Sequence, residues 1–419
     1  MPACRTIRLP LQVRNEDFGS MQHSSNPGGA ARRLVIRNLG LVLTGDIARP
    51  VADADTIVIE NGLIAAVGRE SAIGIGSAGA VIDAKGSAIM PGMIDNHSHP
   101  VMGDWTPRQN QLGWIESTLH GGVTTLVSAG EVHVPGRPGD VVGVKALAIT
   151  AQRAFSRFSP LGMKVLAGAL ILEKGLEEGD FEELAAGGVT LVGEFGLGAV
   201  KDGPTGRKMI EWARRNGMTS MTHTGGHSIP GSARIGSETV LEVDADVAAH
   251  LNGGPTSLPE AELRLICEKS PRYLEIVHNG NMRAALFVLN VIREIGALDR
   301  LVLGTDGPAG SGVQPLGMLR LVTMLASLGD VAPEVAICFA TGNVASMRGL
   351  RDRGRIAEGL AADLVFIDQA MGGAGEGVLD AMTLGNMPGI GMILVDGVQR
   401  IGRSRNTPPS IIVPEFQAA

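Results

Sequence analysis

The stretch "PGMIDNHSHP", residues 91–100, places a strand-like apolar segment directly before His97 and His99. Side chains two residues apart in an extended strand project to the same side, so both imidazoles face one way while Ser98 faces the other. One strand can thus offer two ligands to a metal ion. Histidine pairs also occur in ordinary surface turns, so the interpretation depends on what the rest of the chain brings beside them.

From residue 88 onward, strand-like runs alternate with helical segments. Gly217 and Gly296 are expected to end two of these helices, and Asp180 with Glu183 is expected to begin another. Eight strands are expected, at 88–99, 123–130, 163–172, 189–196, 218–223, 247–252, 274–279 and 301–306. The pattern predicts an α/β fold, a (β/α)8 TIM barrel over residues 88–350.

The segments on either side of the barrel have a different pattern. Residues 33–87 and 351–419 contain short strand-like runs, with hairpin signals at Asn61-Gly62 and Asp396-Gly397. We expect them to form one small β-sandwich domain built from both chain ends. Residues 1–32 carry mixed charges and a Ser/Gly/Pro cluster, which predicts a mobile N-terminal extension.

Composition excludes several classes of protein. Hydrophobic residues make up 44% of the 419 residues, enough for a sizeable core. The net charge of −7 gives no broad cationic surface, so no nucleic-acid partner is expected. No apolar run reaches the length of a membrane span. Cys4, Cys267 and Cys338 are too widely spaced for a disulfide framework, which favours a cytoplasmic location.

Metal-ligating side chains recur at the ends of the predicted strands. Strands of a TIM barrel meet at one rim, where the active site lies, so these side chains are expected to converge. A centre of two metal ions needs several imidazoles and an anionic group between the ions. Zinc, iron(II) and manganese all suit such ligands. The six candidates are His97, His99, Glu194, His223, His250 and Asp306.

This ordered pattern, on a barrel flanked by a split β unit, resembles the amidohydrolase superfamily. The stretches "GEFGLG" (193–198), "HTGGHSIPGSA" (223–233) and "GTDGPAGSG" (304–312) strengthen the resemblance, which runs from about residue 34 to 409. It implies hydrolysis of a cyclic amide by two divalent ions, Zn²⁺ and/or Fe²⁺, in a homo-oligomer. The most specific expectation is opening of 6-oxo-1,4,5,6-tetrahydronicotinate to 2-formylglutarate and ammonia, a step of nicotinate degradation.

The resemblance also implies a role for each ligand. His97 and His99 would bind one metal ion, His223 and His250 the other, and Glu194 would bridge both. Many members use a carbamylated lysine as the bridge, whereas this chain has a carboxylate there. Asp306 would bind one ion and act as the catalytic proton shuttle.

The expected substrate carries a carboxylate, which a guanidinium group recognises well. Arg108 and Arg137 are the candidate partners, although both also fit the pattern of surface loop arginines; Trp105 and His278 are further candidates for contacting the substrate. Two alternatives remain. The first alternative is another cyclic amidohydrolase, of dihydroorotase, hydantoinase or lactamase type. The second is a non-catalytic scaffold with the same fold.

Overall fold

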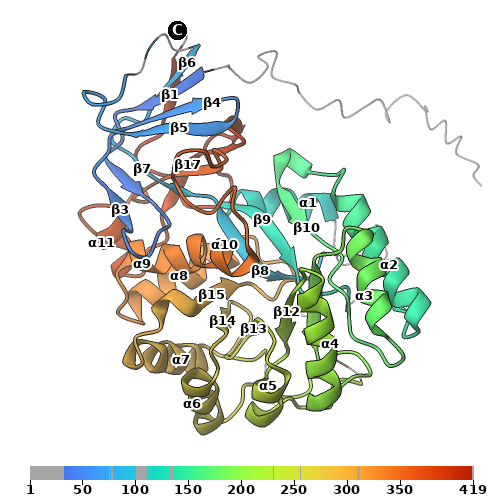
Figure 1. Ribbon diagram of the computed structural model, residues 1–419. Coiled ribbons are helices and arrows are strands. Elements are labelled where there is room, and N and C mark those ends of the chain that lie inside the picture. The colour runs from blue at the N-terminus through green and yellow to red at the C-terminus, as the bar shows by residue number, and fades with distance from the viewer. Residues whose placement is uncertain are drawn as a thin grey trace, which may run out of the picture.

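The structure is a computed structural model that describes residues 33–74, 76, 79–100, 111–132, 134, 136–229, 231–254, 256–308 and 312–417. Trp105, Arg108 and the expected extension at 1–32 lie outside these residues. Figure 1 shows the barrel in the lower part of the molecule and strands from both chain ends gathered above it.

Within the described residues, eight parallel strands form the barrel wall, as the sequence predicts. Three of them pair in the order β10-β9-β8, and five pair in the order β11-β12-β13-β14-β15. Their bounds are β8 Met93–Ser98, β9 Val123–Ser128, β10 Lys164–Leu166, β11 Leu191–Phe195, β12 Thr219–Thr222, β13 Val247–Ala248, β14 Tyr273–Val277 and β15 Leu301–Gly304.

Contacts between the two groups of strands close the barrel. Leu170, beyond β10, pairs in parallel with Val192 of β11. On the other side, the backbone N–H of Asp306 donates to the carbonyl of His97 at 2.9 Å. Asp95 of β8 also accepts from both the backbone N–H and the hydroxyl of Thr305, at 2.8 and 2.6 Å. The ends of β8 and β15 are therefore held side by side.

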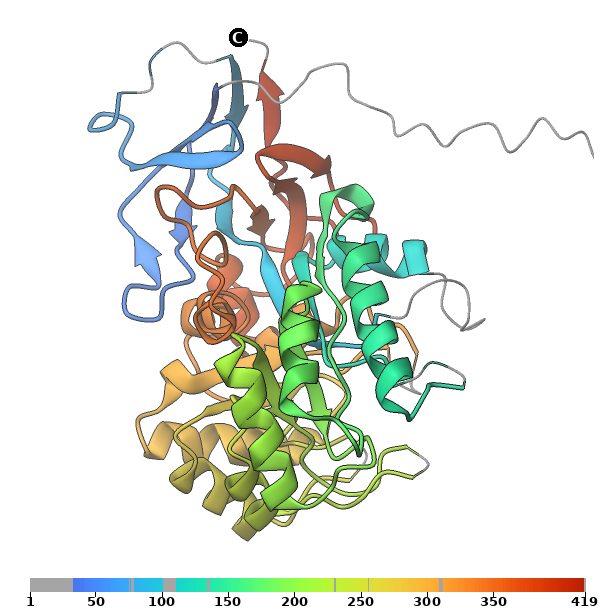
Figure 2. The same ribbon diagram turned by 45° about the vertical axis from the view of Figure 1, so that its right-hand side comes forward.

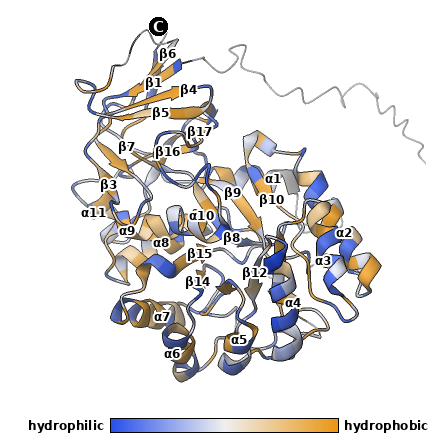
Figure 3. Cartoon of the chain, in the orientation of Figure 1, coloured by the Kyte–Doolittle hydropathy of each residue, from blue (hydrophilic) through white to orange (hydrophobic). Residues whose placement is uncertain are grey.

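Helices surround the strands and connect them (Figures 1 and 2). In Figure 3 the strands are mostly hydrophobic, whereas α4 carries many hydrophilic residues, as expected for an outer helix. The helices are α1 Gln111–Leu119, α2 Val141–Phe155, α3 Glu178–Ala186, α4 Gly203–Arg215, α5 Ser237–Val243, α6 Glu260–Lys269, α7 Met282–Glu294, α8 Gly317–Ser327, α9 Pro333–Phe339, α10 Gly342–Arg348 and α11 Val378–Thr383, with 3-10 turns at Pro160–Gly162 and Leu298–Arg300.

The helix ends agree in part with the sequence. Gly217 and Gly296 follow α4 and α7 and have positive φ angles, +73° and +68°, which glycine adopts at little cost. The expected start of α3 was wrong by one turn. Glu177 is the N-cap and Asp180 is the third helical residue, whose carboxylate accepts from the Glu177 backbone N–H at 2.8 Å.

Two further sheets combine strands from both ends of the chain. One has the order β19-β6-β1-β4-β5 and the other β18-β17-β16-β7-β2-β3. Side chains of both sheets, such as Ile36 of β1 and Phe366 of β16, belong to one buried cluster. The sandwich itself stays a prediction. The bounds are β1 Arg33–Arg37, β2 Leu41–Leu43, β3 Val51–Ala52, β4 Thr56–Glu60, β5 Leu63–Gly68, β6 Ala80–Asp83, β7 Ala88–Pro91, β16 Leu364–Asp368, β17 Gly389–Val395, β18 Val398–Ile401 and β19 Glu415–Gln417.

The first barrel strand is shorter than the sequence pattern indicates. The expected run from residue 88 is divided at Gly92, because β7 pairs with β2 and β16 while β8 enters the barrel. A Cβ atom at Gly92 would lie 2.1 Å from the Thr124 hydroxyl oxygen, so a larger residue at this position would require Thr124 to move. Both halves are apolar and buried, which is why periodicity alone did not separate them.

Candidate metal centre

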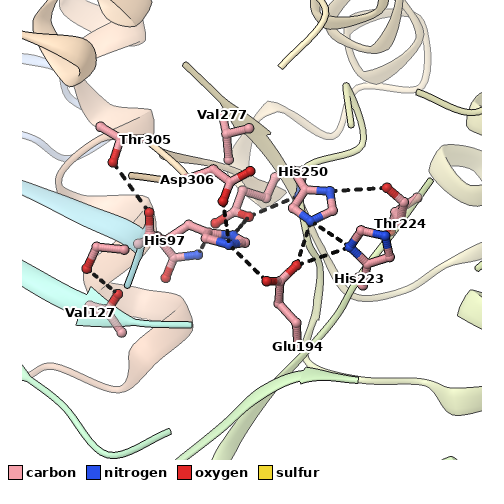
Figure 4. A network of polar contacts seen from close by, with 12 residues as sticks. His97, Val127, Glu194, His223, Thr224, His250, Val277, Thr305 and Asp306 are labelled. Carbon is pink, nitrogen blue, oxygen red and sulfur yellow. Dashed lines mark hydrogen bonds and ion pairs between the residues drawn. The ribbon is translucent and has the colours of Figure 1, made fainter. Parts of the chain in front are cut away.

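The six side chains expected to bind metal come together at one end of the barrel. Five are buried and Asp306 is partly buried. They extend from β8, β11 and the segments that follow β8, β12, β13 and β15. Figure 4 shows His97, Glu194, His223, His250 and Asp306 pointing toward one another. Ser98 points away, and its hydroxyl donates to the carbonyl of Val127 at 2.9 Å.

One half of the centre contains His97, His99 and Asp306. The Nε2 atoms of His97 and His99 lie 3.5 and 3.2 Å from Oδ1 of Asp306. One nitrogen or oxygen atom from each of the three residues falls within 4.8 Å of the others, a spacing that suits a shared metal ion. His97 Nε2 is buried and makes no hydrogen bond within the described part of the chain.

The other half contains His223 and His250. Nδ1 of His223 lies 3.1 Å from Nε2 of His250. Both nitrogens face Oε1 of Glu194, at 3.3 and 2.6 Å respectively. The second oxygen of Glu194, Oε2, faces the first half, 3.5 Å from His97 Nε2 and 3.7 Å from His99 Nε2. Glu194 therefore offers one oxygen to each half.

Hydrogen bonds outside the centre determine which imidazole nitrogens carry protons. Nδ1 of His99 faces the carbonyl of Gly130 at 2.8 Å, Nε2 of His223 faces that of Gly226 at 2.9 Å, and Nδ1 of His250 faces that of Thr224 at 3.1 Å. A carbonyl oxygen only accepts, so these three nitrogens donate. In the neutral ring the opposite nitrogen, which faces the centre, then has a lone pair and no proton.

Lone pairs thus point at lone pairs and at carboxylate oxygens throughout the centre. Such an arrangement is repulsive unless a cation lies between them. The buried His97 Nε2, which makes no hydrogen bond among the described residues, and the spacing of the donors meet the requirements of divalent metal ions held by imidazole and carboxylate.

The carboxylates give the centre a negative electrostatic potential, which stabilises positive charge on its imidazoles. Burial opposes the charge on Glu194, but His97 and His250 outweigh burial and hold the pKa of Glu194 well below its usual value. Burial also lowers the pKa of His97, yet Glu275, Glu194 and Asp306 outweigh it and raise that pKa well above the usual range. A field that favours protonation of His97 also favours binding of a metal cation.

Two of the six residues have an unusual backbone. His250 and Asp306 have φ angles of +32° and +55°, a region that side chains other than glycine rarely adopt. The carbonyl of Asp306 is held by Nδ2 of Asn279 at 2.7 Å, and the backbone N–H of His250 is held by Glu275 at 3.0 Å. Strain of this kind gathers at functional sites.

The expected substrate contacts have different surroundings. Arg137 already pairs with buried Glu173, its Nη1 atom 3.0 Å from Oε1, and Oε2 of Glu173 accepts from the backbone N–H of Ala199 at 2.8 Å. His278 follows β14 and, together with Arg320 of α8, lines part of a small cavity of about 90 Å³. Burial and the neighbouring Arg320 lower the pKa of His278.

The sequence interpretation missed Glu275, Asn96 and Arg348. Glu275 is fully buried in the middle of β14, where its carboxylate contacts Nδ1 of His97 at 2.8 Å. An acidic residue inside the apolar run "YLEIV" was a usable signal, because a strand interior tolerates a carboxylate only when it has partners.

Glu131 gives a prediction about stability and pH. It lies just beyond β9, Oε1 contacts the Ser128 hydroxyl at 3.3 Å, and Oε2 has no hydrogen-bond partner among the described residues. Burial raises the pKa of Glu131 from 4.5 to about 8. Between these values the unfolded chain loses this proton while the folded chain keeps it, so the carboxyl group destabilises the fold increasingly as pH rises.

We therefore expect Glu131→Gln to be more stable than the wild type by a margin that grows from pH 5 to pH 8, at most about 1.4 kcal/mol per pH unit. Denaturant unfolding of both proteins at each pH measures this margin. A margin that does not change with pH would contradict the assignment of a neutral carboxyl group.

Comparisons with known proteins are consistent across sequence and structure. The model of the Amidohydrolase family matches residues 88–397. An enamidase from Eubacterium barkeri is 45% identical over 378 residues, which are 90% of this chain and 98% of that protein. The crystal structure of enamidase matches with a TM-score of 0.88 at 44% identity, over 92% of this chain and 100% of the other. Molinate hydrolase, at 17% identity and a TM-score of 0.59, covers 89% of this chain and 95% of its own, and shares the fold.

Proposed function

The chain belongs to the amidohydrolase family, and we propose that it hydrolyses a cyclic amide at a centre of two divalent metal ions. The observation that carries this proposal is the placement of Glu194, whose two oxygens face two separate sets of imidazole lone pairs. His97, His99 and Asp306 would hold one ion, and His223 and His250 the other. When bound, the ions would polarise the amide carbonyl and lower the pKa of water.

Asp306 is the residue that we propose moves the proton. Its side chain is 16% exposed, whereas that of Glu194 is 3% exposed, so Asp306 is the more accessible of these two carboxylates. As a carboxylate it accepts a proton from the attacking water and then donates that proton to the departing amide nitrogen. The contact with His99 fixes its orientation.

For the substrate we propose 6-oxo-1,4,5,6-tetrahydronicotinate, which would place the enzyme in nicotinate degradation. The identity to enamidase supports this choice. One water opens the ring by breaking the C–N bond of the amide and leaves an enamine. The enamine tautomerises to an imine, a second water adds to it, and ammonia leaves, giving 2-formylglutarate. Two waters are consumed for each ammonia released.

Recognition of the substrate carboxylate is proposed for Arg108 or Arg137, with Trp105 and His278 as further pocket residues. A guanidinium group pairs with a carboxylate through two parallel hydrogen bonds. Arg137 would have to share its guanidinium between the substrate and Glu173, and Arg108 lies outside the described residues.

The remaining proposals concern the metals and the setting of the enzyme. Imidazole and carboxylate ligands suit Zn²⁺ and Fe²⁺, and we propose either or both. We also propose a cytoplasmic homo-oligomer. Cys267 and Cys338 are buried free thiols, which is compatible with a reducing compartment. No helix in the described residues combines the length and apolar character of a membrane span.

A substrate panel tests the proposed activity. Metal-loaded protein is assayed with 6-oxo-1,4,5,6-tetrahydronicotinate, dihydroorotate, hydantoin and a simple six-membered lactam, following ring opening and ammonia release. We expect the tetrahydronicotinate to have the highest kcat/KM, because contacts in the pocket set the choice among cyclic amides. A higher kcat/KM for another ring would overturn the substrate, and hydrolysis of none would overturn the activity.

A further inference from the structure

A chain of buried polar side chains extends from the metal centre through the interior of the barrel. Glu275 of β14 is at its middle, and its carboxylate accepts three hydrogen bonds. Oε2 accepts from Nδ1 of His97 at 2.8 Å and from the backbone N–H of His250 at 3.0 Å. Oε1 accepts from Nδ2 of Asn96 at 2.6 Å. Glu275 thus contacts one ligand from each half of the centre.

Arg348 of α10 fixes the orientation of Asn96. Its Nε atom donates to Oδ1 of Asn96 at 2.7 Å, and Nη2 donates to the Asn96 carbonyl at 3.2 Å. Nη1 donates to the Thr219 hydroxyl at 2.9 Å. A guanidinium group has no acceptor, so the Asn96 oxygen must face Arg348 and the amide N–H groups must face Glu275.

The side-chain hydrogen bonds that link Arg348, Asn96 and His97 to Glu275 consequently all run toward Glu275. Arg348 donates to Asn96, Asn96 donates to Glu275, and on the other side His97 also donates to Glu275. A donor at Nδ1 leaves the lone pair of His97 on Nε2, the atom that faces Glu194 and Asp306.

We propose that Glu275 is a positioning residue, which holds His97 in its metal-binding tautomer and links that ligand to the backbone at His250. The proposal rests on the metal centre in the proposed function. Arg348, acting through Asn96, is its counterpart: it fixes the direction of the hydrogen bonds and supplies the positive charge that offsets the buried carboxylate.

The substitution Glu275→Gln disrupts this arrangement although it hardly changes the size of the side chain. Either orientation of the new amide places an NH₂ group against a donor, which is Asn96 on one side and His97 with His250 on the other. Asn96 cannot turn to relieve the conflict, because its own NH₂ would then face the guanidinium of Arg348. A buried donor opposite a donor leaves both unsatisfied.

The test measures metal affinity, which does not depend on knowing the substrate. Metal-free protein is titrated with Co²⁺, followed by its visible absorption, and with Zn²⁺ in competition. We expect Glu275→Gln to bind the metal about 10- to 100-fold more weakly and to show an altered Co²⁺ spectrum. Wild-type affinity and spectrum in this variant would overturn the proposal.

A matched control separates positioning from general loss of stability. Asp363 is also a buried carboxylate; it accepts from Lys164 Nζ at 2.7 Å and from the Asp396 backbone N–H at 3.0 Å, near the opposite end of β8. We expect Asp363→Asn to lower the unfolding temperature and leave Co²⁺ affinity unchanged. If its metal affinity falls as far as that of Glu275→Gln, the effect is not specific to the chain of polar side chains and the proposal fails.

A double substitution tests the role assigned to Arg348. With Arg348→Met the Asn96 amide is free to turn and to accept from the new amide at position 275. We therefore expect Glu275→Gln with Arg348→Met to regain at least about tenfold in Co²⁺ affinity over Glu275→Gln alone. A double variant as weak as the single one, or weaker, would contradict the directional account. Absence of turnover in a wild type that binds two ions would instead count against the proposed function only.

Discussion

Asp306→Asn is expected to abolish most turnover while the protein stays folded and retains metal. The asparagine amide has nearly the same shape as the carboxylate, and its oxygen can still lie near His99 Nε2, where Oδ1 of Asp306 lies at 3.2 Å. It cannot take a proton from water and return it to the amide nitrogen. Loss of a general acid–base group lowers the rate by roughly 10²- to 10⁴-fold.

The measurement is ammonia release at saturating substrate, expressed per chain that carries two metal ions. Metal content and unfolding temperature are determined on the same preparation, so that a loss of metal is not mistaken for a loss of proton transfer. A variant that retains metal and turns over at the wild-type rate would show that Asp306 is not the proton shuttle.

Glu194→Gln is expected to lose at least half of the bound metal. The amide is neutral and keeps one oxygen, so the position loses its negative charge and only one half of the centre retains an oxygen ligand from it. The new NH₂ group can donate to the lone pairs on His223 and His250, which the carboxylate leaves for a cation. The substitution therefore weakens the metal site and relieves repulsion in the metal-free state.

Two readouts follow from this reasoning. Elemental analysis should give about one ion or fewer per chain, and added Zn²⁺ should raise the unfolding temperature less than it does in the wild type, since stabilisation by a ligand follows its affinity. Glu173→Gln, at another buried carboxylate, is the control and is expected to retain the metal. Full metal occupancy in Glu194→Gln would contradict the proposal that Glu194 bridges the two ions.

The sequence predicted the eight barrel strands and grouped the six candidate metal ligands because two simple signals coincide. Apolar runs mark strands that are buried on both faces, and polar ligand-type residues at their ends mark the catalytic rim. Strand alternation predicted only that His97 and His99 face the same side, and their interpretation as candidate metal ligands depended on the other four residues at the strand ends. The predicted strand at 247–252 was too long, because β13 covers only Val247–Ala248 and His250 lies beyond it with a positive φ angle.

The supporting contacts could not be predicted because they join residues far apart in the chain. Arg348 and Asn96 are separated by 252 positions, and Glu275 and His97 by 178. Which inward-facing residue of β14 lies beside which residue of β8 depends on the register of the closed barrel. The pairing of Arg137 with Glu173 could not be predicted for the same reason, because it joins loops that follow different strands.

Stepwise return of Zn²⁺ to metal-stripped protein, with ammonia release from 6-oxo-1,4,5,6-tetrahydronicotinate measured at each step, tests the two-metal hydrolase most directly. We expect turnover to be absent from stripped protein and to rise until about two ions are bound per chain. Full turnover in stripped protein, or a maximum at a single ion, would contradict a centre in which Glu194 lies between two metals.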